Sequence, residues 1–125
     1  MHDSLTLQPE PRSAGAARRF VREHLRDQVS EDVAETATLL TSELVTNVIV
    51  HARTPMRLDL DVDPDAVPEV VRVAVVDEVP RQPSVRRAHD ARLTGRGMNL
   101  VAELASQWGV EPAPPGKKVW FELPA

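Results

Sequence analysis

The chain has 125 residues, the usual size of one compact domain with its own core. Its 42% hydrophobic and 27% charged residues are ordinary for a soluble globular protein, and its net charge of -4 argues against general nucleic-acid binding. The absence of cysteine excludes disulfides and thiolate metal sites. We find no apolar run of roughly 18 residues and no signal-peptide pattern at the N-terminus, so we expect a cytoplasmic protein without a membrane span.

The first elements are a weak strand and a helix. Residues 1–12 are expected to form an N-terminal edge strand or tail, with the strand over residues 4–8 closed by prolines. Ser13 is the predicted N-cap of a helix with apolar side chains along one side. Residues 13–125 are expected to form a single domain.

A longer helix and two strands follow. The helix is predicted to begin at Ser30, which precedes two acidic residues, and to reach about His51. Residues 56–62 alternate apolar and charged side chains, as in a strand buried on one face. Residues 70–76 are almost continuously apolar and β-branched, which predicts a central strand covered on both faces and ending at Asp77.

The C-terminal third begins with a loop from residue 78 to about residue 96, which lacks any apolar period. Loops of this length are usually lids or binding loops, or are disordered. A third helix is predicted over residues 96–106, and two strands over residues 107–111 and 117–123 close the chain. The inward side chains expected for this helix are Met98, Leu100, Val101 and Leu104. The predicted fold is an α+β two-layer sandwich, with a mixed, mostly antiparallel sheet of four to five strands and three helices on one face.

Glu43 and Asn47 stand four residues apart in an apolar part of the second helix. At this spacing the two side chains share one face, and His51 continues the line one turn later. An apolar stripe of the same spacing runs beside them, so a carboxylate there needs a partner. Mg²⁺ is one candidate, because it binds few protein oxygens and usually bridges to nucleotide phosphates. His51 equally suits the end of the helix, where a cation interacts well with the dipole.

Three further features allow both a binding role and a structural role. Gly95 and Gly97 flank Arg96 at a helix start, where N–H groups attract phosphate, but a sharp turn into the helix also needs glycine. Asp77 ends a strand where sheets of the α/β type place ligand contacts, but it also suits a turn. The loop arginines suit phosphate clamps, a solvated loop or a docking surface for an acidic protein: Arg81, Arg86, Arg87, Arg92 and Arg96.

Three segments together resemble the GHKL ATPase superfamily, the gyrase, histidine-kinase and MutL type. Residues 43–51 (ELVTNVIVH) resemble its N-box, Asp77 falls where the family has its adenine-binding aspartate, and residues 94–101 (TGRGMNLV) resemble its glycine box. The resemblance spans about residues 13–123 and implies a Bergerat-type ATP-binding fold with an ATP lid over residues 78–96. The compact size points to the anti-sigma-factor serine/threonine kinase branch.

This resemblance implies roles for single residues, with ATP and Mg²⁺ as cofactors. The position of Glu43 is the general base, that of Asn47 coordinates Mg²⁺, and that of Asp77 accepts from the adenine amino group. The other positions expected to contact nucleotide are His51, Arg92, Gly95, Arg96, Gly97 and Met98. The implied partners are a sigma factor and an anti-anti-sigma protein of the STAS type, and the family suggests homodimers.

The sequence departs from the family pattern at two places. After the adenine aspartate the family usually has D-x-G-x-G, whereas this chain reads Asp77-Glu78-Val79-Pro80-Arg81. Lys118 stands where many relatives carry a threonine that supports the adenine pocket. Three hypotheses follow: an ATP-dependent serine/threonine kinase that sequesters a sigma factor, a non-catalytic partner-switching module with weak or lost ATP binding, and an unrelated α+β domain.

Overall fold

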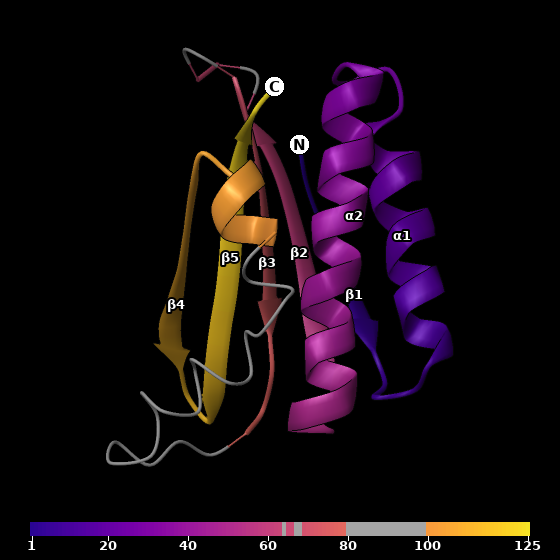
Figure 1. The fold of residues 1–125 in the computed structure, drawn as a ribbon, viewed down its shortest axis with the longest axis vertical. Coiled ribbons are helices and arrows are strands. Elements are labelled where there is room, and N and C mark those ends of the chain that lie inside the picture. Colours follow the sequence, from indigo (N-terminus) through magenta and orange to yellow (C-terminus); the bar gives the residue numbers. More distant parts are fainter. Residues whose placement is uncertain (64, 67–68, 80–99) are drawn as a thin grey trace.

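The structure is a computed structural model that describes residues 1–63, 65–66, 69–79 and 100–125. Its elements occur in the order β1 (His2–Leu7), α1 (Arg12–Leu25), α2 (Glu31–Asn47), η1 (Val48–Ala52), β2 (Met56–Asp63), β3 (Val70–Val76), β4 (Gln107–Ala113) and β5 (Gly116–Pro124). Residues 100–104 are also helical. Both α1 and α2 run side by side along the sheet (Figure 1).

The five strands form one sheet in the order β1-β2-β3-β5-β4, and all four neighbouring pairs are antiparallel. The α+β sandwich is therefore confirmed, with a sheet that is antiparallel throughout the described strands rather than mixed. In the described sheet β1 lies at the edge beside β2, and its bounds His2–Leu7 differ from the predicted strand over residues 4–8.

The core lies between the sheet and the helices. Alternate residues of β2 point into it, because side chains of a strand alternate between two faces. They meet the apolar sides of both long helices, and Val101 joins the same cluster. The fully buried residues with the largest side chains include Phe121, Leu25, Leu40, Met56, Leu58 and Leu60.

Two details of the predicted helices were wrong. Helix α1 begins at Arg12, with Pro11 as its N-cap and no side-chain cap. Proline suits a helix start because it has no N–H to leave unpaired, and Ser13 is a buried residue that donates through Oγ to the Gln8 carbonyl at 2.6 Å. Leu104 does not face inward, since its helical segment leaves it 45% exposed while Val101 is fully buried. Ser30, by contrast, is confirmed as the N-cap of α2, where its Oγ accepts from the Val33 N–H at 3.2 Å.

The helical stretch Glu31–Ala52 is long and apolar enough, by length and composition alone, to cross a membrane. The core helix of a soluble protein meets the same criterion. Leu40, Leu44 and Val45 of this stretch are buried against the core.

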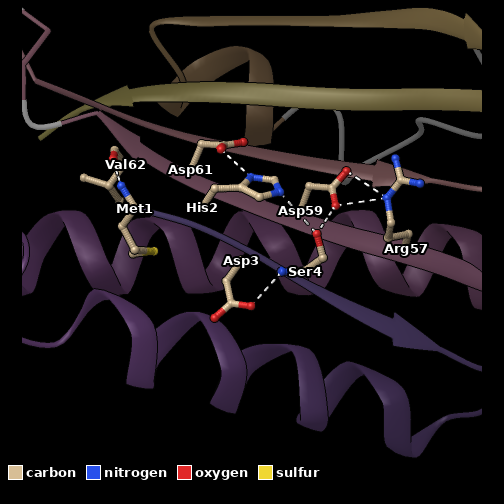
Figure 2. A network of polar contacts seen from close by, with 8 residues as sticks. All are labelled: Met1, His2, Asp3, Ser4, Arg57, Asp59, Asp61 and Val62. Carbon is tan, nitrogen blue, oxygen red and sulfur yellow. Dashed lines mark hydrogen bonds and ion pairs between the residues drawn. The ribbon is translucent and has the colours of Figure 1, made fainter.

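The face of the sheet opposite the helices carries Arg72 beside Ala74 and Trp120, and Ala74 is buried there. Strand β3 is therefore covered only in part on this face, whereas the prediction was a strand covered on both faces. Arg72 of β3 is only partly buried, and its guanidinium lies over the Trp120 ring, 4.4 Å from the centroid. At the β1 and β2 edge, Ser4 Oγ donates to Asp59 at 2.6 Å and His2 Nδ1 lies 2.5 Å from Asp61 Oδ1 (Figure 2). These contacts connect β1 to β2 beside the backbone ladder.

Candidate nucleotide-binding site

The residues of interest gather at one end of the sheet. The C-terminal half of α2, the end of β3 and the start of β5 all lie at the lower end of Figure 1. The chain segments that follow α2 and β3 are joined there, because the Glu78 N–H donates to Thr54 Oγ1 at 3.1 Å. The fold therefore brings the predicted N-box helix and Asp77 to the same end of the molecule.

Helix α2 presents Glu43 and Asn47 at the border of the core. Both side chains are partly buried, while their neighbours Leu44 and Val48 are buried. Neither Glu43 nor Asn47 hydrogen-bonds through its side chain to another residue in the ranges that the structure describes. A carboxylate and an amide, one turn apart and both accessible in part, can offer oxygens to a cation or accept a proton. Their catalytic and metal roles stay predictions.

The helix changes character directly after Asn47. Residues Val48–Ala52 form a π-helical turn, and the Arg53 N–H bonds to the Val48 carbonyl at 2.7 Å, in an i to i+5 pattern. Arg53 then ends the helix in the left-handed conformation with φ 57°. His51 is exposed on this turn. Single π-helical turns within α-helices are frequent at functional sites, but nothing in the described contacts of His51 gives it a ligand.

Asp77 is 2% exposed, and its carboxylate accepts three hydrogen bonds. Oδ1 accepts from the backbone N–H groups of Val79 and Lys117, both at 3.1 Å. Oδ2 accepts from the ammonium of Lys117 at 2.7 Å. The Asp77 N–H in turn donates to the Lys117 carbonyl at 3.0 Å, which continues the pairing of β3 with β5 by one residue. The carboxylate is thus satisfied within the protein.

Gly116 makes this arrangement sterically feasible. A Cβ added at Gly116 would lie 2.6 Å from Asp77 Oδ1 and would also collide with the Asp77 carbonyl group. Only a residue without a side chain lets the first residue of strand β5 approach Asp77 so closely. The backbone of Lys117 is then within hydrogen-bonding reach of the carboxylate.

The lysine that meets the aspartate is Lys117, which sequence analysis missed, and not Lys118. In β5 the inward positions are Val119, Phe121 and Leu123, so Lys117 falls on the core side while Lys118 falls on the opposite face beside Glu111. The alternation of apolar residues at 119, 121 and 123 could have predicted that Lys117 points inward. A lysine at an inward strand position requires a buried acidic partner. The strand register decides which of two consecutive lysines is buried.

The remaining predicted contacts lie outside the residues that the structure describes. They are Arg92, Gly95, Arg96, Gly97 and Met98, together with the predicted lid from residue 80 onward. Within the described ranges, no group of three or more His, Asp or Glu side chains is close enough to hold a metal ion. A Mg²⁺ ion that binds here would therefore take few protein ligands, as Mg²⁺ does when it keeps waters and bridges to phosphates.

The described residues suit the phosphate end of an ATP molecule better than its adenine end. Glu43 and Asn47 suit the end that carries a metal and phosphates. The adenine end does not fit, because three of about four lone-pair positions on the Asp77 carboxylate are already used. An adenine amino group would have to displace the Lys117 ammonium or share Oδ2 with it.

An antiparallel sheet with helices on one face, an acid and an amide on the second long helix, and an aspartate after the central strand define a GHKL-type nucleotide-binding domain. The profile of the histidine kinase-like ATPase domain family matches residues 7–123. The match covers nearly the whole chain, and the protein belongs to this family. No curated protein matches the chain.

Proposed function

We propose that this chain is a nucleotide-dependent regulatory protein of the anti-sigma-factor type, with serine/threonine kinase activity toward a partner protein. The observation that carries the proposal is the pair Glu43 and Asn47 at the border of the core, in the C-terminal half of α2. This half of α2 lies at the same end of the sheet as the end of β3 (Figure 1). Membership of the histidine kinase-like ATPase domain family supports a nucleotide-dependent activity.

The proposal gives each residue on α2 a chemical task. Glu43 accepts the proton of a seryl or threonyl hydroxyl on the partner, which requires a hydrogen bond of roughly 2.6 to 3.2 Å to that hydroxyl. The amide oxygen of Asn47 would hold Mg²⁺. The γ-phosphoryl group would pass from the nucleoside triphosphate to the hydroxyl oxygen, with the nucleoside diphosphate as leaving group. In this proposal the purine base of the nucleotide binds beside Asp77, which follows β3.

The proposed partners are two proteins of opposite effect. The chain sequesters a sigma factor, and an anti-anti-sigma protein of the STAS type relieves this inhibition until it is phosphorylated. We place this exchange in the cytoplasm, without direct contact to nucleic acid or membrane and with a homodimer as the acting form. The net charge of -4 supports the exclusion of nucleic acid.

Transfer of labelled phosphate from a Mg-nucleoside triphosphate to a purified STAS-type partner tests the kinase. We expect Glu43→Gln to remove transfer while nucleotide binding remains, and Asn47→Ala to weaken Mg²⁺-dependent nucleotide binding. Glu35→Gln is the matched control, since Glu35 is an exposed acid earlier on the same helix. Transfer that persists in Glu43→Gln would exclude Glu43 as the base.

A second candidate function is supported by the buried pair of Asp77 and Lys117. Because this pair engages the carboxylate expected to recognise adenine, the domain would act as a non-catalytic partner-switching module whose output is protein association. Its test is the affinity of the chain for a sigma factor with and without Mg-nucleotide. Equal affinities, together with absent phosphate transfer, favour this second function over the kinase.

A further inference from the structure

Lys117 places a positive charge inside the domain at the base end of the candidate site. Only 10% of its side chain is exposed, and 2% of that of Asp77. The ammonium lies 2.7 Å from Asp77 Oδ2, which is the hydrogen-bonding distance of a charge-assisted pair. Lys117 and Asp77 therefore form a buried ion pair and not a solvated surface contact.

The ammonium has more donors than this contact uses. Lysine carries three N–H donors and no acceptor. One donor serves Asp77 Oδ2, and the described residues provide no second acceptor for Nζ. A ligand group that approaches the carboxylate therefore meets an N–H donor that already holds the oxygen. An acceptor on the ligand is favoured there, and a donor is disfavoured.

This difference separates two kinds of purine. A 6-amino purine such as adenine presents a donor at position 6, whereas a 6-oxo purine presents a carbonyl acceptor. A 6-oxo group can accept from Lys117 without breaking the ion pair with Asp77. A 6-amino group must either share Oδ2 with the Lys117 ammonium or displace the lysine from its buried position.

We propose that Lys117 is a specificity-determining residue and that this site takes a 6-oxo purine nucleotide in preference to a 6-amino purine nucleotide. The inference rests on the proposed function, which places the base at Asp77. It deepens that function by naming the class of nucleotide. The residue acts by offering a donor at the place where an adenine site offers only an acceptor.

The experiment compares Mg-ATP with Mg-ITP, because the two bases differ at position 6, where ITP carries an oxo group, and at the adjacent N1, which carries a proton in ITP. Calorimetric titration of the unmodified protein gives the ratio of the two dissociation constants. We expect ITP to bind about tenfold more tightly, because the net contribution of a single hydrogen bond corresponds to a ratio of about this size. The triphosphate of unsubstituted purine riboside, which lacks the 6-substituent, should bind with intermediate affinity.

Two variants test whether Lys117 sets this ratio. Lys117→Met keeps most of the length of the side chain and removes the ammonium, so we expect the preference to disappear or to turn toward ATP. Lys118→Met is the matched control, because Lys118 lies on the opposite face of β5, and its ratio should equal that of the unmodified protein. A purely structural role for Lys117 would change both affinities together and leave their ratio unchanged.

The outcomes separate the inference from the function on which it rests. Tighter binding of ATP than of ITP by the unmodified protein, or an unchanged ratio in a folded Lys117→Met, overturns the inference while the nucleotide-dependent function stands. Binding of none of the three nucleotides to the unmodified protein overturns both. The ratio of the ATP and ITP dissociation constants of the unmodified protein requires no variant. The test therefore remains decisive even if Lys117→Met does not fold.

Discussion

The ammonium of Lys117 lies 2.7 Å from Asp77 Oδ2, in a pair that joins the start of β5 to the end of β3. Both residues are more than nine-tenths buried. A buried ion pair contributes little net stability compared with a well-packed apolar pair, but loss of one partner strands a charge. The pair should therefore tolerate joint replacement better than single replacement.

We expect Lys117→Met to lower the free energy of unfolding by about 3 kcal/mol, since it leaves a buried carboxylate without its counter-charge. The double variant Asp77→Asn with Lys117→Met should recover part of this loss. Urea denaturation monitored by circular dichroism measures both. The control Lys118→Met should cost no more than about 1 kcal/mol, because its ion pair with Glu111 is 3.5 Å long and solvated. Equal losses for the two lysines would contradict a special role for the buried pair.

The close approach at Gly116 should make an added methyl group costly. Gly116→Ala places a Cβ against the Asp77 carbonyl group and 2.6 Å from Oδ1, and neither backbone can move without breaking the pairing of β3 with β5. We expect a loss of about 2 to 3 kcal/mol in the free energy of unfolding. Gly15→Ala, within α1, is the opposite case, because its Cβ would meet only flexible arginine ends at 3.5 and 3.6 Å. That change should stabilise by about 0.5 to 1 kcal/mol, and thermal melts of both variants would show opposite shifts.

Trp120 depends on the glycine opposite it in β4. Its indole Nε1 would lie 2.9 Å from a Cβ at Gly109, and Nε1 is buried without a hydrogen-bond partner in the described structure. We expect Gly109→Ala to displace the ring, weaken its contact with Arg72 and cost about 1 to 2 kcal/mol. Tryptophan emission in a Trp108→Phe background reports the ring directly. An unchanged emission spectrum would show that the strand accommodates the methyl group without moving the indole.

The start of α2 should depend on one hydroxyl. Ser30→Ala removes the acceptor for the Val33 N–H at 3.2 Å, which should cost about 1 kcal/mol. Ser42→Ala is the matched control within α2, since the Ser42 hydroxyl accepts from the Arg18 guanidinium at an exposed site. Its effect should stay within about 0.5 kcal/mol in the same denaturation experiment. Equal effects of the two changes would argue that the N-cap contributes nothing.

Local patterns predicted most of the elements because they depend on neighbours in the sequence. The alternation in residues 56–62 gave β2 with its inward face, and Ser30 before two acids gave the start of α2. The same reasoning misplaced the start of α1, because a proline and a serine within three residues both suit a helix N-terminus. Only the packing of Ser13 against the Gln8 carbonyl distinguishes them.

The sequence by itself determined the α+β class, the i to i+4 pairing of Glu43 with Asn47 and the resemblance to GHKL ATPases, because each depends on spacing along one segment. The tertiary structure decided which lysine meets Asp77, since the register of β5 against β3 selects Lys117 over Lys118. It also decided that the carboxylate is satisfied from within. Contacts between residues 40 positions apart depend on strand pairing across the sheet, which no local pattern contains.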